Sequence, residues 1–202
     1  MHKLYIFSVF ERFWHWTQAA LIIVMGVTGF EIHGTYKWLG FEMAQRVHTT
    51  AAWALIVLWV FAIFWHFTTG EWKQYIPTTE KLQAMMRYYV TGIFTHAPHP
   101  FRVTQLRKHN PLQRLAYLVV KLVINPLIWI SGLLYLYYSH LDSIGLGDLT
   151  LANIAFVHMA AAFMMLSFFI VHVYLATAGH TPTAHIKAMI TGYEEVEDDE
   201  AA

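Results

Sequence analysis

The sequence predicts an all-α integral membrane protein that folds as a four-helix bundle. Of its 202 residues, 57% are hydrophobic and 16% aromatic, and only 13% are charged, which is too apolar for a typical soluble domain. Four apolar runs are each long enough to cross a hydrocarbon core of about 30 Å. We expect one four-helix domain over residues 1–193 and an acidic tail over 194–202, with spans at about 13–30, 47–67, 115–138 and 154–178.

The distribution of basic residues predicts the orientation of the spans. The connection over residues 68–114 carries seven Lys or Arg, whereas residues 139–153 carry two Asp and no Lys or Arg. Since Lys and Arg accumulate in cytoplasmic loops, the long connection is expected in the cytoplasm, and four spans then place both termini there. The first 16 residues lack the features of a cleaved signal peptide, so we expect the first span to be retained.

The long connection itself contains a helix signature. Pro77-Thr78-Thr79-Glu80 is typical of a helix start, and apolar residues follow at helical spacing. We expect an amphipathic helix over about residues 79–93 that lies on the inner membrane surface. The alternative is a helix that packs only on other parts of the protein.

Two Asn-Pro pairs and the tail complete the local expectations. Asn110-Pro111 supplies a cap and a first-turn proline for span three, and Asn125-Pro126 is expected to kink that span because proline removes a helical hydrogen bond. The acidic stretch EEVEDDE is expected to be a solvated, disordered end, with partner docking as the alternative.

Histidine is the main ligand supply of this chain. There are 13 histidines and no cysteine, which excludes disulfides, thiolate-ligated iron–sulfur clusters and covalent c-type haem attachment. His158 and His172 are fourteen residues apart on span four, so they face the same side of a helix, about 21 Å apart. Ionisable residues within a membrane span are functional candidates.

Depth sorts the histidines into two levels. His15 near the start of span one is level with His172 on the inner side, and His48 near the start of span two is level with His158 on the outer side. These two pairs fit the iron ligands of two stacked bis-histidine haems, the inner one on His15 and His172 and the outer one on His48 and His158. The alternative is that they are interior histidines bonded to neighbouring helices.

Two other histidines fit this scheme less well. His66 shares a helix face with His48 but lies roughly 6 Å too deep for the inner level, and His33 lies beyond the outer level. We assign both to the membrane interfaces, where they would contact haem propionates or quinone, or only reach the surface.

Small and basic residues supply possible haem contacts. Gly26 and Gly29 lie near the ligand face at the depth of the outer haem, although small residues also permit close helix packing. Four cations are placed to neutralise haem propionates, although the positive-inside bias and snorkelling also explain the inner ones: Arg46 at the outer level, and Arg12, Arg114 and Lys121 at the inner one.

The chain resembles the cytochrome b561-like family in RFWHWTQAALIIVMGVTGF, in HNPLQRLAYL and in FVHMAAAFMMLSFFIVHVYLATAGHTPTAHIKAMITGYEE. The similarity is to the di-haem membrane subunits of formate dehydrogenases, nickel-iron hydrogenases and thiosulfate reductase-type complexes, whose ligand pattern His15, His48, His158 and His172 match.

The resemblance implies two b-type haems that carry electrons between a membrane quinone, menaquinone or ubiquinone, and a periplasmic redox subunit. That subunit would be a multihaem c-type cytochrome, an iron–sulfur protein or a molybdenum protein. The quinone would bind near the inner haem, lined by His172 and His15, in the inner membrane of a bacterium or archaeon. His66, His180 and His185 are candidates for quinone contact or proton exchange.

Two alternatives remain at the level of sequence. One is a free-standing membrane enzyme such as a superoxide:quinone oxidoreductase. The other is a histidine-lined transporter or a passive anchor. The absence of internal repeats disfavours the transporter, and a passive anchor would not need four paired histidines within its spans. Nucleic acid is not an expected partner.

Overall fold

Four long apolar helices dominate the computed structural model, which describes residues 2–95, 97–101, 103–105, 107–179 and 181–196. They are long and apolar enough to cross a membrane, which confirms the expected all-α membrane fold class: α1 (Val9–Ile32), α2 (Phe41–Thr69), the segment Pro111–Leu136 and α6 (Leu151–Ala176). The third span consists of α4 (Pro111–Val119), a π-helical stretch (Val120–Ile124) and α5 (Asn125–Leu136). Each overlaps the range expected from sequence.

Shorter elements join the spans. They are β1 (His2–Tyr5), the 3₁₀ turns Glu71–Tyr75, Gly92–Phe94 and Tyr138–Ile144, α3 (Leu82–Val90), α7 (Ala184–Thr191) and β2 (Tyr193–Val196). The chain divides into two compact units. Unit 1 comprises residues 1–74, 103–108 and 179–202, and unit 2 comprises residues 75–102 and 109–178.

The spans have apolar exteriors and polar buried positions. Val60, Leu122 and Ile170 are 60–66% exposed, as suits side chains that contact lipid. By contrast, Thr28, Asn125 and Ser131 are buried within their spans, at most 5% exposed. Because hydrocarbon supplies no hydrogen bonds, polar groups of a membrane protein must turn toward other protein groups or bound ligands.

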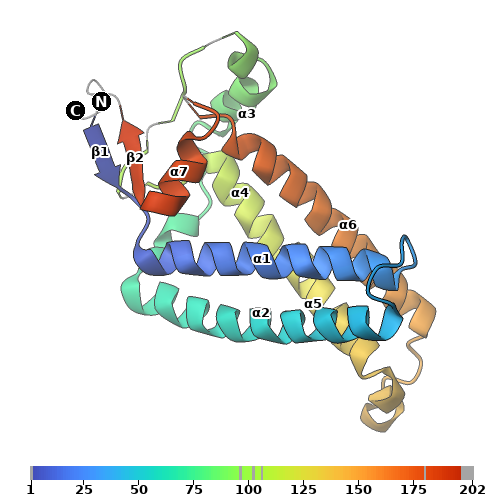
Figure 1. Ribbon diagram of the computed structural model, residues 1–202. Helices are drawn as coiled ribbons and strands as arrows, with labels where there is room; N and C mark the ends of the chain where they lie inside the picture. The colour runs from blue at the N-terminus through green and yellow to red at the C-terminus, as the bar shows by residue number, and fades with distance from the viewer. Residues whose placement is uncertain (1, 96, 102, 106, 180, 197–202) are drawn as a thin grey trace. The chain divides into compact units, whose positions relative to one another are not determined.

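The core of unit 1 is the antiparallel hairpin of α1 and α2, which run side by side (Figure 1). Trp59 Nε1 on α2 donates to Gln18 Oε1 on α1 at 2.7 Å. At the end of α1, Glu31 Oε1 accepts hydrogen bonds of 2.5–2.7 Å from the backbone N–H groups of Trp38, Leu39 and Gly40. The buried carboxylate thus folds the connection that leads into α2.

A two-stranded antiparallel sheet joins the two ends of the chain in unit 1. Residues 2–5 pair with residues 193–196, and the Gly192 carbonyl accepts from the Ile6 N–H at 2.8 Å. Arg12 Nη1 donates to the Ile190 carbonyl at 2.7 Å, so the start of α1 is tied to α7. The expectation of a disordered acidic tail is therefore wrong for residues 194–196, since backbone pairing with β1 orders them. Residues 197–202 lie outside the described part of the chain.

A buried ion cluster fixes the second part of the long connection in unit 1. Lys108 Nζ lies 2.8 Å from Glu11 on α1 and 2.9 Å from Glu71 just after α2, and the side chains of Lys108 and Glu11 are only 7% and 8% exposed. Burial alone would lower the pKa of Lys108, but hydrogen bonds to the two carboxylates outweigh it, so the pKa lies above its ordinary value. The stabilisation that comes from the raised pKa of Lys108 is complete at neutral pH and is lost as the pH rises through that pKa.

Unit 2 contains the predicted N-terminal cap of the third span and an irregular turn before Pro126. Asn110 caps α4 in a capping box with Gln113, and Pro111 occupies the first turn, as expected. Pro126 cannot donate a backbone hydrogen bond, and the turn before it widens to the π-helical stretch Val120–Ile124. The helix predicted over 79–93 is present but shorter, as α3 over 82–90, because Lys81 adopts a left-handed conformation (φ 57°) just before it.

Replacing Lys108 with Met should destabilise unit 1 by about 3–5 kcal/mol, because it leaves the buried Glu11 carboxylate without its cation. Thermal unfolding in detergent would measure the loss. Lys187→Met is the matched control, since its contact with Glu195 is exposed (63% and 36%) and should contribute under about 1 kcal/mol. Equal effects of the two substitutions would contradict a buried ion cluster.

Candidate haem-binding site

The four candidate haem ligands are divided equally between the two units. His15 on α1 and His48 on α2 belong to unit 1, whereas His158 and His172 on α6 belong to unit 2. All four side chains are half-buried. Each predicted pair takes one histidine from each unit, and the pairing remains a prediction. The surroundings of each histidine within its own unit are as follows.

His48 is held by a hydroxyl group of the neighbouring helix. Its Nδ1 lies 3.1 Å from Thr28 Oγ1 on α1. The Thr28 hydroxyl donates its own proton to the Val24 carbonyl at 2.7 Å, so its oxygen serves His48 as an acceptor. His48 Nδ1 therefore carries a proton, and the Nε2 lone pair is the one able to bind a metal.

His158 is held in the same manner in unit 2. Its Nδ1 lies 3.0 Å from Ser131 Oγ and 3.1 Å from the Ile128 carbonyl, both on α5. A carbonyl oxygen only accepts, so His158 Nδ1 also carries a proton and its Nε2 lone pair is the metal-binding one. Ser131 donates its proton to the Leu127 carbonyl at 2.5 Å.

A glycine next to each hydroxyl residue makes room for the imidazole. A Cβ atom on Gly29 would lie 3.3 Å from His48 Cε1, and one on Gly132 would lie 3.1 Å from His158 Cε1. Gly29 therefore lies beside a candidate ligand, whereas Gly26 has nothing within 4 Å of its would-be Cβ. The haem contacts predicted for both glycines remain predictions.

An aromatic ring lies against each of the other two histidines. The His172 ring stacks on Phe168 one turn earlier in α6, with centroids 5.7 Å apart and planes at 20°. Phe168 contacts Tyr117 of α4, and Tyr117 contacts His109. His15 lies edge-on to Trp16 at 5.1 Å. Flat rings of this kind suit a site for a planar macrocycle.

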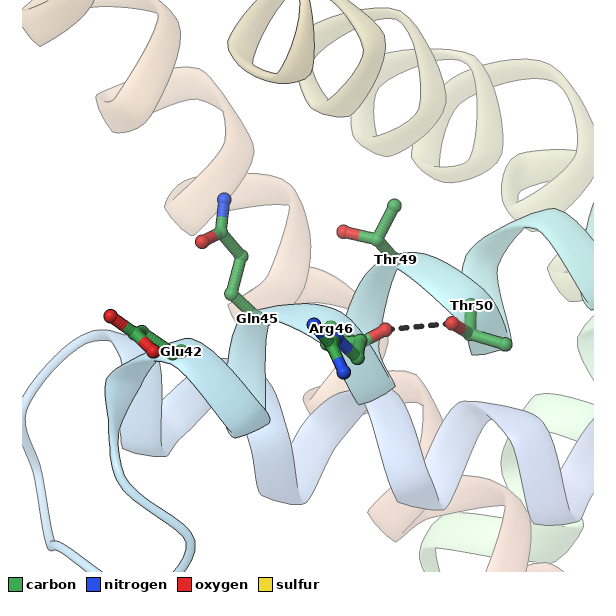
Figure 2. A pocket seen from close by; sticks show the side chains of 5 residues that line it. All are labelled: Glu42, Gln45, Arg46, Thr49 and Thr50. Carbon is green, nitrogen blue, oxygen red and sulfur yellow. Dashed lines mark hydrogen bonds between the residues drawn. The ribbon is translucent and has the colours of Figure 1, made fainter.

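The four predicted propionate-binding cations have different surroundings. Arg46 is exposed and lines a polar hollow of about 440 Å³ at the start of α2, together with Glu42, Gln45, Thr49 and Thr50 (Figure 2). Arg12 is bonded to the Ile190 carbonyl, and Arg114 Nε donates to the His109 carbonyl at 3.0 Å. Lys121 Nζ lies 3.3 Å above the centre of the Tyr75 ring, a cation–π contact.

The histidines predicted for the membrane interfaces or for quinone contact lie on different elements. His66 is buried near the end of α2, where its Nδ1 donates to the Ala62 carbonyl at 2.6 Å and its ring meets Trp14. His185 on α7 lies 3.4 Å from Glu194 in β2. His33 is exposed at the end of α1. His180 lies outside the described residues.

The sequence reasoning missed Thr28, Ser131 and Gly132. The signal was present as the dipeptides Thr28-Gly29 and Ser131-Gly132, the pairing of a small hydroxyl residue with glycine inside an apolar helix. Trp14 and Asn125 were also missed: Trp14 Nε1 and Asn125 Nδ2 are buried with no hydrogen-bond partner among the described residues. Both are available to a bound polar group.

Comparison with known proteins identifies the family. The model of the protein family described as "Prokaryotic cytochrome b561" matches residues 6–192. The chain belongs to the prokaryotic cytochrome b561 family. It is 30% identical over 198 residues to the "Putative cytochrome YdhU" of Escherichia coli K12, an alignment that covers 95% of this chain and 74% of that protein. No solved structure matches the chain significantly. This b561-family protein is thus a multi-pass membrane cytochrome that transfers electrons through b-type haem.

The site residues of this cytochrome fit b-type haem. Haem of this type is held without thioether bonds, in agreement with a chain that lacks cysteine. Imidazole is the expected axial ligand, and His48 and His158 present the required Nε2 lone pair while a neighbouring oxygen holds Nδ1.

Gly29→Ala and Gly132→Ala should each reduce haem binding, because the added methyl group forces His48 or His158 to shift. Overpacking of this kind costs about 1–3 kcal/mol. A pyridine haemochrome assay on purified protein would measure the haem content. Wild-type haem content in both variants would contradict a critical contact between these glycines and the two histidines.

Proposed function

We propose that this cytochrome is a di-haem membrane subunit that transfers electrons between the membrane quinone pool and a periplasmic redox partner. The observation that carries the proposal is that His48 and His158, in different units, are fixed alike with Nε2 as the metal-binding atom. Two such histidines supply the two ligands of a hexacoordinate haem iron. Bound b-type haem would supply one-electron redox chemistry within the membrane.

The proposed ligand pairs follow from depth. Successive spans alternate in direction, so α2 and α6, the second and fourth spans, would run the same way. His48 near the start of α2 and His158 near the start of α6 would then share one outer level. His15 near the start of α1 and His172 near the end of α6 would then bind the inner haem. The fourteen-residue spacing on α6 separates the two levels by about 21 Å.

The basic residues are proposed to bind the propionates. Arg46 is proposed for the outer haem, because it lies within one helical turn of His48 on α2 and its long side chain is exposed; it lines the polar hollow shown in Figure 2. For the inner haem we propose Arg12, Arg114 and Lys121. Lys121 is the preferred candidate of the three, since its ammonium group lies over the Tyr75 ring, a contact that leaves its charge without a counter-ion among the described residues.

The quinone, menaquinone or ubiquinone, is proposed to bind near the inner haem. Quinone reduction and oxidation move protons together with electrons, so a titratable group is needed there. His66, His180 and His185 remain the proposed groups. His66 has the most suitable surroundings, because its Nδ1–H is bound to Ala62 and its ring lies against Trp14.

The proposed setting is the inner membrane of a bacterium or archaeon, with residues 1–193 as the haem domain in contact with lipid. Pairing of residues 2–5 with residues 193–196 supports a location of both strands on the same side of the membrane. We propose that this is the cytoplasmic side, and that α3 lies on the inner membrane surface. Met86 and Val90 of α3 are 52% and 72% exposed, in agreement with lipid contact.

Purified protein should contain two b-type haems per chain, and His158→Ala should remove one of them. His66→Ala should retain both, because His66 is assigned no iron. A pyridine haemochrome assay and the reduced absorption spectrum would count the haems. A folded wild-type protein without haem would refute the di-haem assignment, and two haems in His158→Ala would refute the ligand assignment.

Isolation of the tagged chain from its native membrane should yield a complex with a c-type cytochrome, iron–sulfur or molybdenum subunit. In that complex, quinol should reduce the haems, or the reduced partner should reduce quinone. A chain that purifies alone and reduces quinone with superoxide would instead support the free-standing oxidoreductase.

A further inference from the structure

The same local arrangement occurs twice in this chain, once in each unit. A dipeptide of one hydroxyl residue and glycine, Thr28-Gly29 on α1 or Ser131-Gly132 on α5, packs against a histidine of the adjacent helix. We call these dipeptides the hydroxyl–glycine cradles. We propose that Thr28 and Ser131 are positioning residues that fix the two outer-haem ligands and lower the reduction potential of that haem; this rests on the proposed function.

The hydroxyl groups are themselves fixed, so they act as acceptors and not as donors. Thr28 Oγ1 gives its proton to Val24 O at 2.7 Å, and Ser131 Oγ gives its proton to Leu127 O at 2.5 Å. Both side chains are buried, 2% and 3% exposed. Each oxygen therefore turns a lone pair toward the histidine opposite.

The glycines determine how closely each imidazole approaches. With would-be Cβ distances of 3.3 Å at His48 and 3.1 Å at His158, any larger residue would push the ring away from the hydroxyl oxygen. The cradle thus restrains the ring in two ways, by a hydrogen bond at Nδ1 and by backbone contact at Cε1. Restraint of a ring before it binds iron reduces the entropy lost on binding.

An acceptor at Nδ1 also changes the electronic properties of the ligand. A hydrogen bond from Nδ1–H to oxygen raises the basicity of Nε2. A more basic imidazole stabilises ferric over ferrous iron, because the ferric ion carries more charge. Both proposed outer ligands have this bond, so their effects on the outer haem add. In the proposed inner pair, the His172 ring stacks on Phe168.

The test compares Thr28→Val and Ser131→Ala with the wild-type protein in detergent, by redox titration of the haem absorption and by transfer of haem to apomyoglobin. Each variant should raise the potential of one haem and leave the other unchanged. Haem loss from that site should be about 10–100-fold faster. The effect of Ser131→Ala should be partly offset, because the Ile128 carbonyl remains as an acceptor.

Conservative and matched variants complete the design. Thr28→Ser and Ser131→Thr keep a hydroxyl group and should retain the wild-type potentials. Thr68→Val and Ser167→Ala remove exposed hydroxyls that bond only within their own helices, to Phe64 and Phe163, and should change neither haem.

The outcomes separate this inference from the proposed function. Unchanged potentials in Thr28→Val and Ser131→Ala, in a protein where His158→Ala removes one haem, would overturn the cradle inference alone. Two haems in His158→Ala would overturn the ligand assignment. An equal change in both haems would also overturn the inference, because it would indicate a general loss of structure.

Discussion

Hydrocarbon offers no hydrogen bonds, so every polar group within a span must find its partner inside the protein or in a bound ligand. This constraint explains which residues are buried here. Many large apolar side chains of the four spans are exposed, whereas Thr28, Glu31, His66 and Ser131 are buried. Each of these four polar side chains makes hydrogen bonds within its own unit.

The same constraint prepares histidines for metal. A neutral imidazole in a membrane needs an acceptor for its N–H, and the other nitrogen is then the ligand. Thr28 supplies that acceptor to His48, and Ser131 with the Ile128 carbonyl supplies it to His158. The adjacent glycines permit the close contact. Two units with different connectivity thus reach the same local solution.

The part of unit 1 that contains β1 and β2 depends on different interactions. There, charges are paired: Lys108 binds Glu11 and Glu71. The strands β1 and β2 join the two ends of the chain beside α7. These contacts connect residues far apart in sequence. Among them, the ion pair of Lys108 holds Glu11 in the first turn of α1, four residues before His15. A rigid start to α1 restricts how far this histidine can move.

The sequence by itself determined the elements whose signal is local. Length and apolarity gave the four spans, Asn110-Pro111 gave the start of α4, and Pro126 gave the irregular turn, because each of these depends on near neighbours along the chain. Histidine spacing also gave candidate ligands in a family that binds b-type haem.

Only the tertiary structure decided which side chains meet across helices. Thr28 and Ser131 are 20 and 27 residues from the histidines they hold, and Lys108 is 97 residues from Glu11. The ordering of residues 194–196 likewise required a strand from the other end of the chain. Periodicity along one helix indicates which residues share a face, but it carries no information about the side chains that a neighbouring helix places opposite them.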